Sequence, residues 1–181
     1  MRPPIHHLVL VGLMGTGKTT TGRILAARLG WPLRDSDAEI EALTGRSVRE
    51  LRDEVGTDPM HDLEAQALLR AVADAGPDVV CAAASVVDRE DCLEALRGDG
   101  VAVAWLTVSP EIGARRFTSG AHRPWYGEDP ATFLARQARE REPAFQSVDP
   151  VIVSTDHREP GAVADAIVAG LEERGIELDR A

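Results

Sequence analysis

The sequence predicts an α/β fold of three layers, in which a central parallel sheet of five strands lies between helices on both faces. Short apolar runs alternate along the chain with segments of helical periodicity, and this alternation is typical of parallel sheets covered by helices. The longer runs are almost entirely apolar, as strands buried on both faces require. The 181 residues contain neither repeats nor a linker, so we expect a single domain over 1–181.

The apolar runs supply the predicted strands. The first, residues 7–11, leads directly into a glycine-rich turn. The run at 79–87 is interrupted by one polar residue, Ser85, and is read as a buried strand with its exit. The other predicted strands are 32–34, 101–108 and 151–153.

Helices are predicted between these strands. Gly30 is placed to end the first helix, and Ser36 with Glu39 has the capping-box spacing that opens the second. Pro143 should end its helix near Arg141, because proline cannot continue a helix. The predicted helices are 18–29, 36–43, one opened by Ser47 and Glu50, 60–75, 90–97, one opened by Ser109 and Pro110, 129–141 and 161–171. A mobile loop is expected at 118–127, which has no periodicity.

The composition excludes several classes of protein. Hydrophobic residues make up 44% and charged residues 28%, which is ordinary globular usage and not that of a disordered or fibrous chain. Acidic side chains outnumber basic ones 30 to 20, and the net charge of -10 disfavours a nucleic-acid partner. Cys81 and Cys92 are too few for a disulfide scaffold, and no apolar run reaches the roughly 18 residues of a membrane span. We expect a cytoplasmic protein without a nucleic-acid or membrane partner.

A glycine-rich loop carries the strongest chemical signal. Gly12-x-x-x-x-Gly17-Lys18-Thr19 follows a predicted strand and opens a predicted helix, which is the context that a P-loop requires. Glycines let backbone amides close around phosphate oxygens, and the helix N-terminus favours the anion. Lys18 would reach the β- and γ-phosphates of a nucleotide, and the Thr19 hydroxyl would bind Mg²⁺. Lys18 is also the one lysine among the 20 Lys and Arg residues. The alternative is a glycine turn that only packs a helix on a strand.

The P-loop indicates that the protein binds a nucleotide but does not identify the reaction. The sequence has no Asn-Lys-x-Asp tetrapeptide for reading guanine, and 181 residues leave no room for the ring-forming modules of motor ATPases. A small phosphotransferase remains, or a binding module that has lost its chemistry.

The P-loop and the short motifs after it occur in a definite order. Those that match a known pattern are Gly15-Thr16-Gly17-Lys18-Thr19-Thr20, Asp35-Ser36-Asp37, Thr44-Gly45-Arg46-Ser47-Val48, Arg123-Pro124 and Arg141-x-Pro143-x-Phe145. In order and spacing they resemble the motifs of shikimate kinases, a P-loop family with a nucleoside-monophosphate-kinase-like fold. The resemblance runs nearly end to end. It implies transfer of the γ-phosphoryl group of ATP, with Mg²⁺, to a hydroxyl of a small acceptor by a monomer or weak homodimer.

On the nucleotide side, the resemblance implies a role for each matched residue. Nucleotide binding would fall to the loop 15–20 together with Arg116 and Arg158. Asp35 would hold the hydrated Mg²⁺ with Thr19. The alternative for Asp35 is structural, because a carboxylate near a helix N-terminus is stabilised by the helix dipole alone.

On the acceptor side, the resemblance implies an acceptor-binding region at about 36–75 and a lid at about 115–128. Asp37 would accept hydrogen bonds from the acceptor hydroxyls, and Arg141 would bind the acceptor. Arg123 would stabilise charge on the transferring phosphoryl group as the lid closes. The alternatives are a helix-start carboxylate for Asp37, a solvated loop arginine for Arg123 and a cation near a helix C-terminus for Arg141.

The sequence departs from the family pattern within the acceptor site. His61 stands where an arginine would bind the acceptor carboxylate, and Ala82-Ala83-Ala84 replaces a turn of three glycines. A histidine is mostly neutral at pH 7 and offers no bidentate fork, and an alanine at a position with positive φ would be strained by ~1 to 2 kcal/mol. We therefore expect these residues to bind an acceptor other than shikimate, such as a cyclitol or sugar acid. A divergent but genuine shikimate kinase and a silent nucleotide-binding regulator are the alternatives.

Overall fold

A parallel sheet forms the centre of the molecule. The structure, a computed structural model, describes residues 4–118 and 128–178. Within that part of the chain the sheet has five strands in the order β2-β3-β1-β4-β5, and every neighbouring pair is parallel. The strands are β1 (His7–Val11), β2 (Leu33–Asp35), β3 (Asp78–Cys81), β4 (Val101–Thr107) and β5 (Val151–Ser154). The predicted fold class is confirmed.

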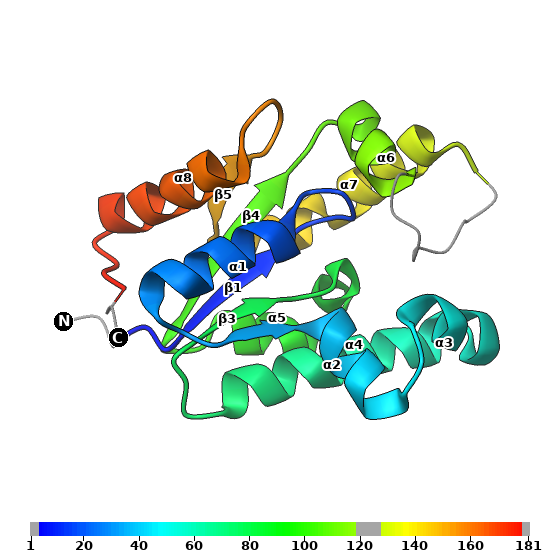
Figure 1. Ribbon diagram of the computed structural model, residues 1–181, viewed down its shortest axis with the longest axis horizontal. Coiled ribbons are helices and arrows are strands. Elements are labelled where there is room, and N and C mark those ends of the chain that lie inside the picture. Colours follow the sequence, from blue (N-terminus) through cyan, green and yellow to red (C-terminus); the bar gives the residue numbers. More distant parts are fainter. Residues whose placement is uncertain (1–3, 119–127, 179–181) are drawn as a thin grey trace.

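Helices cover both faces of the sheet. The described helices are α1 (Lys18–Leu29), α2 (Ser36–Thr44), α3 (Val48–Val55), α4 (Thr57–Ala73), the 3₁₀ helix η1 (Ala84–Asp88), α5 (Glu90–Leu96), α6 (Pro110–Thr118), α7 (Pro130–Gln146) and α8 (Pro160–Glu173). On one face lie α1 and α8, and on the other lie α4, α5 and the end of α7 (Figure 1).

The central strand β1 contributes to two cores. Its residues Leu8 and Leu10 pack with α1 and α8, whereas Val9 and Val11 pack with α4 and α5. All four are fully buried, and burial of such a side chain stabilises the fold by ~1.5 to 3 kcal/mol. A strand with both faces buried explains why its sequence is apolar throughout and not alternating.

A third, smaller core holds one wall of the site together. Ile40 of α2, Leu51 of α3 and Met60 of α4 pack on one another beside the sheet. Ser47 and Glu50 form the predicted capping box that opens α3. Figure 1 shows α2, α3 and α4 together along the lower side of the view.

The prediction that Pro143 ends its helix near Arg141 is wrong. The helix α7 continues through Pro143 to Gln146. Pro143 and Arg139 are both exposed, so the Arg139 carbonyl that loses its donor can bond to water. One turn further on, Phe145 is 1% exposed and stacks on Trp105 with ring centroids 5.1 Å apart. Burial of this ring offsets the lost hydrogen bond and keeps the last turn helical.

Two helix starts also differ from their predictions. The N-cap of α2 is Asp35, one residue before the predicted Ser36, because the Asp35 carboxylate accepts from the backbone amides of Asp37 and Ala38. Helix α4 begins at Thr57, three residues before the predicted start at 60. The exit of β3 is the 3₁₀ helix η1.

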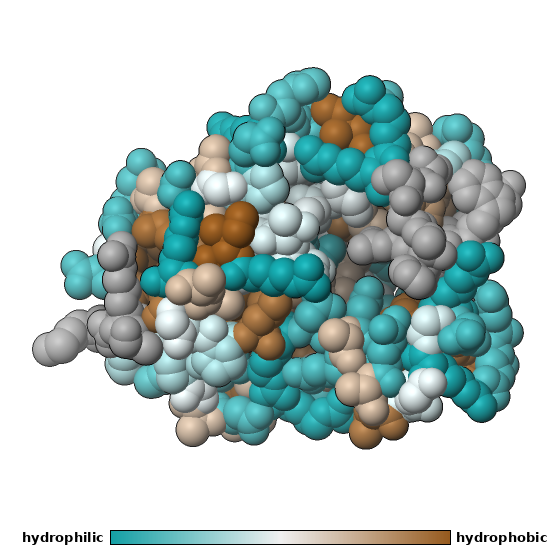
Figure 2. Space-filling model, viewed as in Figure 1, coloured by the Kyte–Doolittle hydropathy of each residue, from teal (hydrophilic) through white to brown (hydrophobic). Residues whose placement is uncertain are grey.

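The face shown in Figure 2 is mainly hydrophilic, with apolar side chains in separate patches. Among the described residues, the exposed large apolar side chains are Leu43, Val55 and Ile152. None of the described helices has the length and apolar character to cross a bilayer.

Candidate active site

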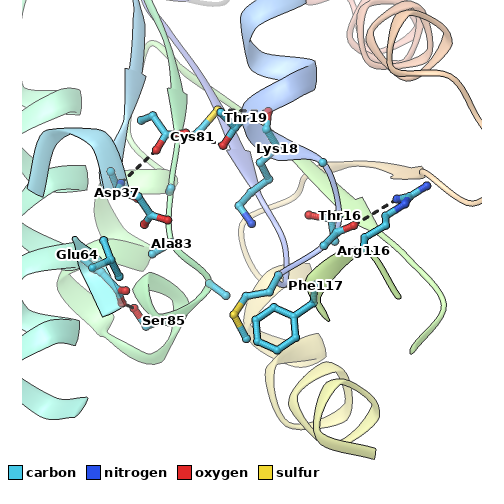
Figure 3. Close-up of a pocket in the computed structure, with 18 of the residues that line it drawn as sticks. Thr16, Lys18, Thr19, Asp37, Glu64, Cys81, Ala83, Ser85, Arg116 and Phe117 are labelled. Carbon is cyan, nitrogen blue, oxygen red and sulfur yellow. Dashed lines mark hydrogen bonds between the residues drawn. The ribbon is translucent and has the colours of Figure 1, made fainter. Parts of the chain in front are cut away.

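A cavity opens at the carboxyl-terminal edge of the sheet. Because β1, β2 and β3 are parallel, the segments that follow them meet at this edge. The cavity has a volume of about 920 Å³ and extends from the loop after β1 to side chains of α2, α3 and α4. Figure 3 shows Lys18 and Thr19 on one side, with Asp37, Glu64 and Ser85 on the other. The predicted nucleotide-binding and acceptor-binding residues therefore share one space.

The loop between β1 and α1 is shaped by its glycines. Gly15 has φ +79°, and a Cβ added there would lie 2.6 Å from the carbonyl oxygen of Gly113. Gly17 is the N-cap of α1 with φ 85°, a left-handed conformation that other residues adopt at a cost. The Thr16 side chain, 1% exposed, donates to the carbonyl of Leu13 at 2.8 Å. The loop thus brings the amides at the start of α1 to the cavity, where they favour an anion.

Lys18 lies across this loop. Its Nζ donates to the carbonyl oxygens of Gly12 at 2.7 Å and Leu13 at 3.1 Å. These contacts hold the ammonium group against the loop, where its charge adds to the positive end of the α1 dipole. Thr20 also lines the cavity beside it. The arrangement suits the phosphate groups of a nucleotide.

Thr19 and Asp35 form a contact between the loop and the second strand. The Thr19 hydroxyl donates to Asp35 Oδ2 at 2.6 Å, while Asp35 Oδ1 accepts from the amides of Asp37 and Ala38. Asp35 thus caps α2 with one oxygen and meets Thr19 with the other. A hydroxyl and a carboxylate are ligands that Mg²⁺ accepts. The described residues contain no cluster of three or more His, Cys, Asp or Glu side chains suited to a metal ion.

Two predicted arginines lie at the nucleotide end of the cavity. Arg116 donates to the Gly15 carbonyl at 3.2 Å and to the Thr155 hydroxyl and carbonyl at 2.9 and 3.0 Å. Arg158 lines the same cavity. Arg123, predicted for the lid, lies outside the described residues.

A buried carboxylate stands at the far end of the cavity. Glu64 is 5% exposed and accepts a hydrogen bond from the Ser85 hydroxyl. Burial raises the pKa of Glu64, and the Ser85 hydrogen bond and the charge of Arg52 oppose that rise. Asp37, the second residue of α2, faces the same space (Figure 3). The acceptor end therefore offers carboxylates that can accept hydrogen bonds from hydroxyl groups.

Arg141 reaches this end of the cavity from α7. Its Nε and one terminal nitrogen donate to the two oxygens of Asp88 at 2.9 and 2.6 Å, and its other terminal nitrogen donates to Gln137. Its side chain is 14% exposed. Because α7 continues to Gln146, Arg141 lies more than a turn before the helix end, and the alternative of a cation that serves the helix C-terminus loses its basis.

His61 lies within range of the positive charges of Arg52 and Arg141 and of the negative charges of Asp58 and Asp88. It lines the cavity and is half-buried. Burial lowers the pKa of His61, and the charges of Arg52 and Arg141 lower it further. The neutral form of the imidazole is therefore favoured over the charged form, and both guanidinium groups act on the same imidazole.

The three alanines that replace glycines line the cavity without strain. Of the described non-glycine residues, Asp149 and His157 have positive φ, so Ala82, Ala83 and Ala84 do not. Ala83 has φ -64° and ψ 154°, which any residue adopts. The strain considered for these positions is absent, and the change adds methyl groups to the wall without distorting the turn.

Sequence reasoning missed Arg52 and assigned no role to Glu64 or Ser85. Arg52 lines the cavity from α3, and its terminal nitrogen lies 3.6 Å from Glu64 Oε1. A motif signal for Arg52 is lacking, because arginines are spread along the whole chain. Glu64 carried a detectable signal, since a buried carboxylate in an apolar helix face needs a partner.

Comparisons with known proteins agree on one family. The family model for shikimate kinase matches residues 14–172. The chain is 38% identical over 172 residues to a shikimate kinase of Symbiobacterium thermophilum, with 93% of this chain and 98% of that protein covered. It is 35% identical over 170 residues to a shikimate kinase of Pseudomonas syringae pv. tomato, with the same coverage of each chain, 93% and 98%.

Solved structures share the fold of this chain. The shikimate kinase from Acinetobacter baumannii in complex with shikimate matches with a TM-score of 0.88 and 25% identity over 96% of each chain. A gluconokinase from Sinorhizobium meliloti 1021 shares the fold, with a TM-score of 0.64 and 22% identity over 96% of this chain and 95% of that one.

Proposed function

Since the chain belongs to the shikimate kinase family and is an ATP-dependent kinase of small hydroxylated molecules, we propose that its acceptor is shikimate itself. One observation carries the proposal: a single cavity joins the P-loop to an end that holds both Asp37 and the mostly buried Arg141. Shikimate carries hydroxyl groups and a carboxylate, and these are the groups that a carboxylate and a guanidinium recognise.

The nucleotide would bind along the P-loop wall. Amides of 15–20 would cradle the phosphates, and Lys18 would turn from the carbonyls of Gly12 and Leu13 towards the phosphoryl oxygens. Arg116 and Arg158 would contact the nucleotide at that end of the cavity. These residues would fix the γ-phosphoryl group in line with the acceptor, which is the main source of rate in such transfers.

Thr19 and Asp35 would hold Mg²⁺. Their oxygens already meet at 2.6 Å, at the junction of the P-loop and α2, and hard oxygen donors suit this ion. When bound, the ion neutralises charge on the phosphate oxygens.

Asp37 would act on the acceptor. Its carboxylate would accept a hydrogen bond from the attacking hydroxyl and orient the oxygen towards the γ-phosphorus. The new bond joins that oxygen to phosphorus, and the hydroxyl proton passes to the Asp37 carboxylate. The bond to the bridging oxygen breaks, so that ADP leaves with the electron pair. Arg123 would stabilise charge on the phosphoryl group as part of the predicted lid at about 115–128, and the acceptor would bind in the region at about 36–75. We also expect a monomer or weak homodimer in the cytoplasm.

A kinase with another acceptor is the second candidate, and His61 with the three alanines favours it. Both changes fall on the acceptor wall, so a cyclitol or sugar acid remains a reasonable acceptor to test. A silent regulator is not retained, because the chain belongs to a family of phosphotransferases and keeps Asp37, Arg141 and the P-loop in one cavity.

A coupled assay for ADP release tests the proposal. We expect turnover with shikimate at a micromolar to millimolar KM, the ordinary range for enzymes. No turnover with shikimate, together with turnover of a cyclitol or sugar acid, would transfer the assignment to the second candidate.

A further inference from the structure

Arg52 lines the acceptor end of the cavity. In the family pattern an arginine stands at position 61 of this end, and this chain has His61 there. Arg52 extends from α3, whereas His61 belongs to the next helix, α4. Both side chains line the cavity, and a terminal nitrogen of Arg52 lies 3.6 Å from Glu64, which follows His61 by one turn of α4. A guanidinium is therefore present beside position 61, although it comes from a different helix.

The burial of Arg52 indicates a role beyond solubility. Its side chain is 13% exposed, against the exposed Arg49 one turn earlier on the same helix. Moving a guanidinium out of water is unfavourable unless nearby charges and hydrogen bonds compensate. The ion pair with Glu64 spans 3.6 Å, which exceeds the length of a charge-assisted hydrogen bond. Glu64 also accepts from Ser85. The geometry between Arg52 and Glu64 is thus that of a loose pair at a cavity wall.

Arg141 by itself is less suited to bind the acceptor carboxylate. Asp88 already accepts from its Nε through both oxygens and from one terminal nitrogen through Oδ2. Gln137 accepts from the other terminal nitrogen. An acceptor carboxylate at Arg141 would place two carboxylates on one guanidinium. A second guanidinium across His61 relieves that repulsion.

We propose that Arg52 supplies the guanidinium that binds the carboxylate of the acceptor, with His61 beside it as a hydrogen-bond donor. The inference rests on the proposed function and deepens it. The histidine at 61 and the arginine at 52 then form a compensating pair, in which the cation has moved from α4 to α3. The acceptor end keeps its charge despite the change at position 61.

A comparison of two acceptors tests this role. Shikimate carries the carboxylate, and its methyl ester has the same hydroxyls without the negative charge. In Arg52→Gln we expect kcat/KM for shikimate to fall about 10- to 100-fold, the loss typical of a hydrogen bond to a charged group. The value for the methyl ester and the KM for ATP should stay within about threefold, since neither depends on that bond. Arg49→Gln is the matched control and should leave all three unchanged.

Two further variants keep the test decisive if Arg52→Gln is unstable. Arg52→Lys retains the charge but loses the planar fork, so shikimate should be affected and the ester spared. In the double variant His61→Arg with Arg52→Gln, the new arginine should recover most of the loss, whereas His61→Arg alone should gain little because the cation is already present. Thermal melts of each variant identify any loss that comes from unfolding.

The outcomes separate this inference from the proposed function. Equal losses for shikimate and its ester, or no loss for either, with a wild-type enzyme active on shikimate, would overturn the role of Arg52 and leave the function standing. A wild-type enzyme inactive on shikimate would overturn both.

Discussion

The two walls of the cavity are built differently. The nucleotide wall is a turn of backbone held by glycines, and Lys18 donates to the carbonyl oxygens of Gly12 and Leu13 at 2.7 and 3.1 Å. The acceptor wall consists of side chains from separate elements, among them Asp37 of α2, Arg52 of α3, Glu64 of α4 and Arg141 of α7. Backbone geometry ties the first wall to one sequence pattern, while the second can obtain the same charge from another helix.

The largest effect is expected on the nucleotide wall. Lys18→Ala should lower kcat by at least about 10³-fold, because Lys18 would neutralise charge on the phosphates as an arginine finger does, and such an arginine contributes about 10³ to 10⁵ in rate. The circular dichroism spectrum should not change. Arg28→Ala, at the far end of the same helix and in an exposed pair with Asp165, is the control and should keep full activity. A kcat for Lys18→Ala close to wild type would contradict the assignment of this wall.

On the acceptor wall, the largest loss of activity is expected when Asp37 is substituted. Asp37→Asn keeps the size of the side chain but removes its charge, and we expect kcat to fall about 10²- to 10⁴-fold, the usual range for a group that assists proton transfer. Steady-state kinetics with varied ATP should give an unchanged KM for ATP. Asp53→Asn, on the exposed side of α3, serves as the control. If Asp37→Asn lost less than about threefold, the carboxylate would be a helix-start residue only.

A substitution at Gly15 tests whether the nucleotide wall depends on the close approach of its backbone. Gly15→Ala would place a Cβ 2.6 Å from the Gly113 carbonyl, so we expect a loss of about 1 to 3 kcal/mol in the free energy of unfolding and weaker ATP binding by calorimetry. Gly175→Ala is a matched control with φ +69° and no atom within 4 Å of the added Cβ. Gly175→Ala should lose only the stability that the left-handed backbone conformation costs an alanine, and it should bind ATP normally. Equal losses of ATP affinity in both variants would show that the close approach at Gly15 is unimportant.

The smallest effect is a pH dependence on the acceptor wall. Burial and the charges of Arg52 and Arg141 lower the pKa of His61 in the folded state below its value of 6.5 in the unfolded chain. The stability that comes from a neutral His61 is therefore present above pH 6.5 and is lost as pH falls through the lowered pKa. Urea unfolding of wild type and His61→Gln between pH 5 and 8 should show wild type losing stability relative to the variant at the acid end. Parallel curves would contradict this electrostatic description.

The fold could be predicted because its signals are local. Apolar runs such as 7–11 and 101–108 are long enough to identify strands, and Gly30 marks the end of α1 with a left-handed C-cap. The end of α7 could not be predicted, because the stacking of Phe145 on Trp105, far away in the sequence, outweighs the local signal of Pro143.

The residues of the candidate site also differ in whether a local sequence signal could predict them. The P-loop residues were predicted from one continuous motif that the fold places at the cavity. The role proposed for Arg52 could not be predicted, because it depends on the packing of α3 against α4 through Leu51 and Met60. His61 alone pointed to a changed acceptor, whereas His61 together with Arg52 points to a relocated cation.

A competition assay tests the central claim most directly. Equal concentrations of shikimate, a cyclitol and a sugar acid are mixed with limiting enzyme and ATP, and the phosphorylated products are resolved by mass spectrometry. The account predicts that phosphorylated shikimate dominates from the earliest time point. Dominance of either other product, with shikimate left unchanged, would contradict it.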